Sequence, residues 1–177
     1  RAIDIAIAHE NGKYYAIWKD RTKERGDWAR IGYARTMDED FTFVGKNGRM
    51  QFLLEDGTQS DKTHENFEFI KIDGSWYLLS TDYKPHQPVL YKMKGDGSKD
   101  EDWTKWGNGR VLNVPEESFN THRKSNAAFL ADWRKHDGYF YLLYAGKTHS
   151  FTHRGRGNNK LGLARSKNLV SWEVPQK

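Results

Sequence analysis

The sequence contains no cysteine and no long apolar run. With no cysteine among 177 residues, disulfides and thiolate zinc sites are excluded. No apolar stretch approaches the roughly 18 residues that a membrane-spanning helix needs, so we expect no membrane partner. A net charge of +5, from 29 Lys and Arg against 24 Asp and Glu, is spread along the chain without a long basic run. Nucleic acid is therefore not an expected partner either.

Aromatic residues, in contrast, are abundant. They make up 14% of the chain, with 7 Trp, 9 Tyr and 9 Phe, while charged residues reach 30%. A chain of this length can bury the core of one domain or form part of a larger repeating one. Because the sequence begins at Arg1, without Met or a signal peptide, we expect a processed or trimmed product, and its cellular location stays open.

One phrase occurs three times: Asn or Asp followed by Gly, one further residue, two aromatic residues and an apolar strand. Asn-Gly and Asp-Gly between β-rich runs are strong signals of a β-hairpin, because a type I′ turn needs positive φ at both central positions. The turn glycines are Gly12, Gly74 and Gly138, so the intervals are 74 − 12 = 62 and 138 − 74 = 64 residues. Such an interval predicts a structural repeat. The three copies are Asn11–Trp18, Asp73–Ser80 and Asp137–Tyr144.

Each repeat predicts four short antiparallel strands, and no segment has a convincing amphipathic helical pattern. We therefore predict an all-β fold, a partial β-propeller of three four-stranded blades in one domain, with blades at about 1–48, 62–108 and 122–175. The first strand of each blade lies at the propeller axis, where polar residues at its start converge. The expected first strands are Ile3–Ala8, Phe67–Lys71 and Ala127–Leu130; the third strands are Ile31–Thr36, Val89–Met93 and Leu161–Ser166; the last strands are Phe41–Val44, Trp103–Trp106 and Trp172–Val174.

The stretch His64-Glu65-Asn66-Phe67-Glu68 falls one residue short of the zinc-binding pattern H-E-x-x-H, which requires a helix. Here the aromatic residues alternate with period two and lead into an Asp-Gly turn, which indicates a strand. We therefore expect no zinc site. The prediction places Glu65 at the entry of an innermost strand, and pairs Glu68 with a neighbouring Lys or Arg.

Three segments resemble the five-bladed propeller glycosidases of glycoside hydrolase family 43 and its relatives. "AIDIAIAHENGKYYAIWKD" resembles their third blade, "HENFEFIKIDGSWYLLSTDY" their fourth, and "LGLARSKNLVSWEVP" the phrase that closes their blades. The resemblance implies that the chain corresponds to the last three blades, with Glu65 as the general acid and Asp4 as the carboxylate of the third blade. The chain departs from the family where Asn66-Phe67 replaces Gly-Pro, and where His122-Arg123-Lys124-Ser125-Asn126 replaces His-Gly. The family's general base, an Asp on the first blade, has no counterpart in three blades.

From these features we predict a glycoside hydrolase in which Glu65 is the acid and Asp4 a supporting or basic carboxylate. The predicted substrate is a carbohydrate, no cofactor is expected, and a structural cation at the propeller axis stays open. Two alternatives remain: a carbohydrate-binding propeller without catalysis, and a structural or assembly module. Asp4 also has a purely structural interpretation, as a buried hydrogen-bonding group. The predicted substrate-binding residues are His64, Asn66, Asp82, His122, Arg123 and Asn126.

A three-bladed chain also predicts a partner. Propellers close with about four to eight blades, so three blades leave two aromatic-rich faces uncovered. We expect a homodimer that buries at least about 1,600 Å², or else a fragment whose missing blades lie elsewhere.

Overall fold

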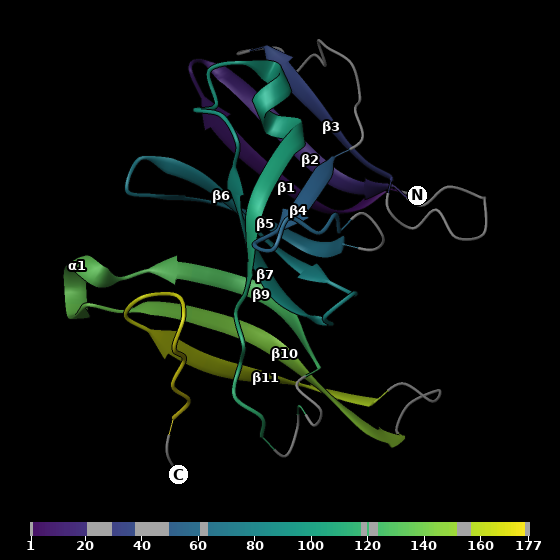
Figure 1. Ribbon diagram of the computed structural model, residues 1–177, viewed down its shortest axis with the longest axis vertical. Coiled ribbons are helices and arrows are strands. Elements are labelled where there is room, and N and C mark those ends of the chain that lie inside the picture. The colour runs from purple at the N-terminus through teal and green to yellow at the C-terminus, as the bar shows by residue number, and fades with distance from the viewer. Residues whose placement is uncertain are drawn as a thin grey trace.

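The computed structural model describes residues 2–20, 30–37, 50–60, 64–117, 120, 124–151 and 157–175, and these form three β-sheets with two short helices (Figure 1). The N-terminal sheet contains β1 (Ala2–Glu10), β2 (Lys13–Asp20) and β3 (Arg30–Met37). The central sheet contains β4 (Gln51–Leu54), β5 (His64–Ile72), β6 (Ser75–Asp82), β7 (Gln87–Met93) and β8 (Lys105–Val111). The C-terminal sheet contains β9 (Ser125–Asp132), β10 (Phe140–Phe151) and β11 (Gly157–Ser166). The predicted all-β class is confirmed.

The strand order is β1-β2-β3, β4-β8-β7-β6-β5 and β11-β10-β9. Every pairing is antiparallel except that between β4 and β8, which is parallel. Figure 1 shows the central sheet lying between the other two, and the sheets remain open. Within the described residues, no helix has the length and apolar character needed to cross a membrane.

Two of the three predicted Asp-Gly or Asn-Gly turns form as expected. Asn11 and Gly12 have φ values of 50° and 70°, and Asp73 and Gly74 have 48° and 78°, as a type I′ turn requires. The third prediction is wrong. Asp132 pairs with Phe140 across seven intervening residues, which include the single helical turn α1 (Arg134–Asp137). Gly138, at φ 84°, ends this turn in the left-handed conformation, and its N–H donates to the Arg134 carbonyl.

The predicted last strands differ from the observed structure more than the predicted inner strands do. Trp103 lies in the short 3-10 helix η1 (Asp100–Thr104), and the strand begins only at Lys105. At the C-terminal end a single bridge between Arg165 and Glu173 replaces the strand expected at 172–174. The segment 41–44 lies outside the described residues. Among the described residues, a full antiparallel meander of four strands is therefore seen only in β5 to β8. The strand β4 is an additional strand that the repeat did not predict.

The central sheet is buried on both faces. Leu78 and Leu79 are neighbours on β6 and therefore point to opposite faces, yet each is 0% exposed. Leu78 packs in a cluster with Ala6, Tyr15 and Ile17 of the N-terminal sheet. Leu79 packs in a second cluster with residues of the C-terminal sheet, such as Leu130 and Leu142. Two apolar layers thus hold the three sheets in succession, and the first strands of the sheets, β1, β5 and β9, contact one another in that order.

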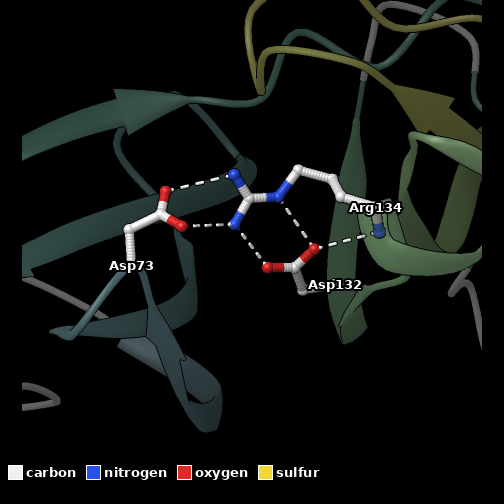
Figure 2. A network of polar contacts seen from close by, with 3 residues as sticks. All are labelled: Asp73, Asp132 and Arg134. Carbon is white, nitrogen blue, oxygen red and sulfur yellow. Dashed lines mark hydrogen bonds and ion pairs between the residues drawn. The ribbon is translucent and has the colours of Figure 1, made fainter.

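Polar contacts join neighbouring sheets where these first strands end. The guanidinium of Arg134 donates two hydrogen bonds to Asp73, at 2.9 and 3.1 Å, and two to Asp132, at 2.6 and 2.9 Å (Figure 2). Glu10 of β1 similarly accepts hydrogen bonds from Lys71 at 2.8 Å and from the Trp76 indole at 2.9 Å. The hairpin ends of adjacent sheets are therefore held in register, which leaves the opposite ends of β1, β5 and β9 to form a common edge.

Candidate functional site

At that opposite end, two carboxylates from neighbouring sheets meet one lysine. The Lys19 ammonium lies 3.3 Å from Asp4 Oδ2 and donates a short hydrogen bond to Glu65 Oε1. The lysine side chain is only 4% exposed, whereas those of Asp4 and Glu65 are 24% and 23% exposed. With all three groups ionised, the formal charge of the cluster is −1. The structure therefore brings the two predicted catalytic residues together around a buried cation.

Tyr83 and Asn126 extend this cluster towards the C-terminal sheet. The Tyr83 hydroxyl donates to Glu65 Oε2 at 2.9 Å. Burial, followed by the charge and the hydrogen bond of Glu65, raises the pKa of Tyr83 to about 12, while a hydrogen bond from the Asn126 side chain acts in the opposite direction. We call Asp4, Lys19, Glu65, Tyr83 and Asn126 the polar row. It draws on all three sheets.

Local backbone geometry explains how β1 and β5 place their carboxylates. Each strand carries a β-bulge near its start, between Ile3 and Ala6 in β1 and between Glu65 and Glu68 in β5. One residue in each bulge, Asp4 or Asn66, has a φ of 59°. Asp and Asn tolerate this left-handed conformation better than other non-glycine residues. The bulge changes the direction of the side chains that follow, so the same strand serves the apolar core and a polar edge.

Lys19 and Tyr83 were not among the predicted site residues. Lys19 follows Tyr15 and Ile17 on β2 with period two, and both of these are buried against the central sheet. This alternation was a readable signal that Lys19 points to the same inner face. Tyr83 directly follows Asp82, the residue that pairs with His64 in the ladder, and so lies at the same end of the sheet as Glu65. Finding it required the register of two strands, which the sequence alone does not give.

His64 and Asp82 lie beneath the polar row, and both are 0% exposed. Asp82 accepts hydrogen bonds from the Tyr91 hydroxyl at 2.7 Å and from the Ser60 hydroxyl, and His64 Nε2 lies 3.5 Å from it. Burial by itself would raise the pKa of Asp82, but the hydrogen bond and charge of His64, together with those two hydroxyls, outweigh burial and hold the pKa at about 2. Full burial corrects the prediction that His64 and Asp82 contact a substrate directly. They instead support the strand ends from below.

The remaining predicted residues have mixed positions. Asn66 accepts a hydrogen bond from the Thr81 hydroxyl at 2.9 Å, and that hydroxyl accepts one from the Ala127 N–H at 2.8 Å, so Asn66 helps to link β5 to β9. His122 and Arg123 lie outside the described residues. The expected pairing of Glu68 with Lys or Arg is wrong, because its carboxylate accepts a hydrogen bond from the Leu130 N–H at 2.7 Å.

No group of three or more metal-ligating side chains occurs in the part of the chain that the structure describes. A surface hollow of about 730 Å³ lies on the C-terminal sheet, lined by Tyr141, Leu163, Trp172 and Glu173 among others. None of its lining residues belongs to the polar row. The ionisable chemistry and this hollow are thus in different places, and convergence of charged groups identifies the polar row as the candidate site.

Solved structures of glycosidases, family 43 members among them, have folds similar to that of this chain. The RS223 β-xylosidase aligns with a TM-score of 0.60 at 14% identity, over 98% of this chain and 58% of its own. The GH43B protein of the Bacteroides ovatus xyloglucan locus aligns with a TM-score of 0.58 at 13% identity, over 98% of this chain and 28% of its own. The Cellvibrio cellulosa α-L-arabinanase, solved with arabinohexaose, aligns with a TM-score of 0.57 at 12% identity, over 96% and 54%.

These alignments confirm the expected resemblance to family 43 propeller glycosidases at the level of the fold. No family model matches the sequence, and no curated protein matches it. The chain spans between 28% and 58% of the length of these three structures. At 12–14% identity, the likeness concerns the fold, and activity has to be argued from the polar row.

Proposed function

We propose that the chain takes part in hydrolysis of a glycosidic bond, with Glu65 as the proton donor. The observation that carries this proposal is the convergence of Glu65 and Asp4, from the first strands of adjacent sheets, on the single ammonium of Lys19. The fold's similarity to glycosidases supports it. We further propose that the three sheets are three blades of a propeller, which puts the polar row at the axis, where a substrate would enter.

The geometry favours Asp4 as a supporting carboxylate rather than as the base. Asp4 Oδ2 lies 3.3 Å from Lys19 Nζ and Glu65 Oε1 lies within hydrogen-bonding distance of it, so the two oxygens are at most roughly 6 Å apart. Inverting glycosidases keep acid and base about 6.5 to 9.5 Å apart to hold a water molecule. We therefore assign the base to a carboxylate outside this pair. Asp4 holds Lys19 in place and contributes negative charge beside Glu65.

A carbohydrate-binding module without catalysis is the second candidate, and one observation favours it. Both oxygens of Glu65 already accept hydrogen bonds, one from Lys19 and one from Tyr83. A carboxylate held in this way is well suited to accept hydrogen bonds from sugar hydroxyls. To act as an acid, Glu65 must exchange one of these contacts for the glycosidic oxygen.

Aryl glycosides with different leaving groups separate the two candidates. The names of the structural neighbours make aryl β-xylosides and aryl α-L-arabinosides the first substrates to test. If Glu65 is the acid, Glu65→Gln should slow cleavage of poor leaving groups by about 10²- to 10⁴-fold, while substrates with a nitrophenolate leaving group lose much less. Glu55→Gln is the matched control, because Glu55 forms a surface ion pair with Arg110. Equal activity of Glu65→Gln and wild type on poor leaving groups would exclude Glu65 as the acid.

We also propose that a second copy of the chain covers the open outer faces. On the N-terminal sheet Ile5 and Ile7 are 60% and 65% exposed, and on the C-terminal sheet Phe129, Leu161 and Leu163 are 54%, 71% and 42% exposed. The cross-strand register places Phe129 and Leu163 on either side of Leu143, so they form one apolar row. Burying such surface favours association. A partner copy would also be one source of the missing base.

A further inference from the structure

The loop that joins β6 to β7 places two aromatic rings beside Glu65. The rings of Tyr83 and His86 lie 4.7 Å apart, centre to centre, at an interplanar angle of 33°. Both side chains are half-buried, so each rests on the protein while keeping part of its surface accessible. Because the Tyr83 hydroxyl donates to Glu65 Oε2 at 2.9 Å, the ring pair adjoins the proposed acid.

This loop is held in a fixed conformation from both sides. The buried Asp82 carboxylate accepts a hydrogen bond from the Lys84 N–H at 2.8 Å, which shapes the start of the turn. The His86 carbonyl accepts one from the Ser125 N–H at 3.1 Å, which ties the end of the turn to β9. His86 itself adopts a φ of 55°, a conformation that a non-glycine residue keeps only when its surroundings enforce it. The two rings are therefore pre-positioned.

Asn126, the second residue of β9, supplies the third element. Its side-chain amide donates to the Tyr83 hydroxyl, so it lies at the same edge as the ring pair. The Asn126 Oδ1 is sheltered from solvent and has no hydrogen-bond partner among the described residues. A buried acceptor without a partner is costly, and a ligand hydroxyl would relieve that cost.

We propose that Tyr83, His86 and Asn126 form a sugar-binding subsite beside Glu65. A sugar ring combines an apolar C–H face with hydroxyl donors on its rim, and this arrangement offers two rings for the face and one carbonyl oxygen for a hydroxyl. Lys19 occupies Oε1 of Glu65 and Tyr83 contacts Oε2, so we place the sugar on the Oε2 side of the carboxylate. The inference rests on the proposed carbohydrate function, but it requires binding only.

Binding to the Glu65→Gln chain tests the subsite without turnover. Xylotriose and arabinotriose would be titrated into this background and followed by amide chemical shifts. We expect the largest shifts at Tyr83 to His86 and at Asn126. Tyr83→Phe keeps the ring and should bind within about twofold of the background, whereas Tyr83→Ala and Asn126→Ala should each weaken binding by about fivefold or more. Tyr139→Ala, an aromatic substitution at the other end of the C-terminal sheet, is the matched control.

The outcomes separate this inference from the proposed enzyme. Saturable binding with this pattern, but no hydrolysis by the wild-type chain, supports the subsite and rejects the hydrolase. The subsite is rejected if Tyr83→Ala and Asn126→Ala bind or hydrolyse the sugars as well as the chain that keeps Tyr83 and Asn126. Shifts centred elsewhere, or no binding of either trisaccharide at about 10 mM, which means a binding free energy weaker than about 2.7 kcal/mol, also overturn it. Should Tyr83→Ala fail to fold, the shift map of the background chain and Asn126→Ala still decide the matter.

Discussion

Replacing Glu68 with Gln should remove a pH-dependent loss of stability. Glu68 lies on β5, between the central and C-terminal sheets, and accepts a hydrogen bond from the Leu130 N–H at 2.7 Å. Burial raises the pKa of Glu68 from 4.5 to about 7, and the bond from Leu130 only partly opposes this increase. Gln keeps an oxygen that can accept the same bond, but it carries no charge.

The sign and the size of the effect follow from linkage. Because the folded-state pKa lies above the unfolded value, the folded chain binds more protons between pH 4.5 and 7, and Glu68 destabilises the fold as the pH rises through this window. A difference of about 2.5 pH units corresponds to at most about 3.4 kcal/mol. Since the side chain keeps some contact with water, we expect about 2 kcal/mol.

Urea unfolding of wild type and Glu68→Gln at pH 5, 6, 7 and 8 measures this effect. The two proteins should be nearly equally stable at pH 5, and Glu68→Gln should be more stable by about 2 kcal/mol at pH 8. Other titrating groups are common to both proteins and cancel in the difference. Glu68→Ala is the control, because it leaves the buried Leu130 N–H without its acceptor and should be less stable than Glu68→Gln by about 1 to 3 kcal/mol at every pH. Parallel stability curves for wild type and Glu68→Gln would refute the reasoning.

Three further predictions concern other parts of the structure. Lys19→Met leaves Asp4 and Glu65 without their cation and should lower the free energy of unfolding at pH 7 by about 2 kcal/mol. Lys19→Arg should stay closer to wild type. Equal urea midpoints for Lys19→Met and wild type would contradict a stabilising ion cluster. Arg134→Ala breaks the exposed ion pairs of Arg134 with Asp73 and Asp132 in Figure 2 and should lower the free energy of unfolding by only about 0.5 to 1 kcal/mol. A much larger loss of thermal stability would show that Arg134 does more than form surface ion pairs. Light scattering at micromolar concentration should give the mass of a dimer, and a stable monomer that binds no apolar dye would reject the proposed covering of the open faces.

The repeats could be predicted from the sequence because their signals are local. Asn11-Gly12 and Asp73-Gly74 require positive φ at two adjacent residues, and this requirement is met within the turn itself. The third turn failed because the connection from Asp132 to Phe140 is longer, so Gly138 ends a helical turn instead of forming a two-residue hairpin. The dipeptide is the same in both settings. The length of the connection, which depends on where the flanking strands pair, decides between them.

Longer-range features were not readable in the same way. The strand β4 pairs in parallel with β8, although about 50 residues of chain separate them, and no local pattern encodes such a partner. Burial of Asp82 is a similar case. Its carboxylate becomes inaccessible only because Ser60, Tyr91 and His64 arrive from three other segments. Sequence reasoning correctly placed Glu65 and Asp4 at strand entries, but it could not tell which polar neighbours face outwards and which lie beneath.

Lys19 shows what a closer reading of alternation would have added. Tyr15, Ile17 and Lys19 occupy one face of β2, and the first two are 1% and 0% exposed. A lysine in that position must find anions, because an unpaired buried ammonium is too costly. In the structure these anions are Asp4 and Glu65, which were already predicted at the strand entries. Lys19 therefore limits the roles open to the two carboxylates. It holds Asp4 and Glu65 too close together for the acid and base of an inverting glycosidase, and it occupies one oxygen of Glu65. The proposed catalysis thus requires a base from elsewhere, and Glu65 must be released from Lys19 or Tyr83.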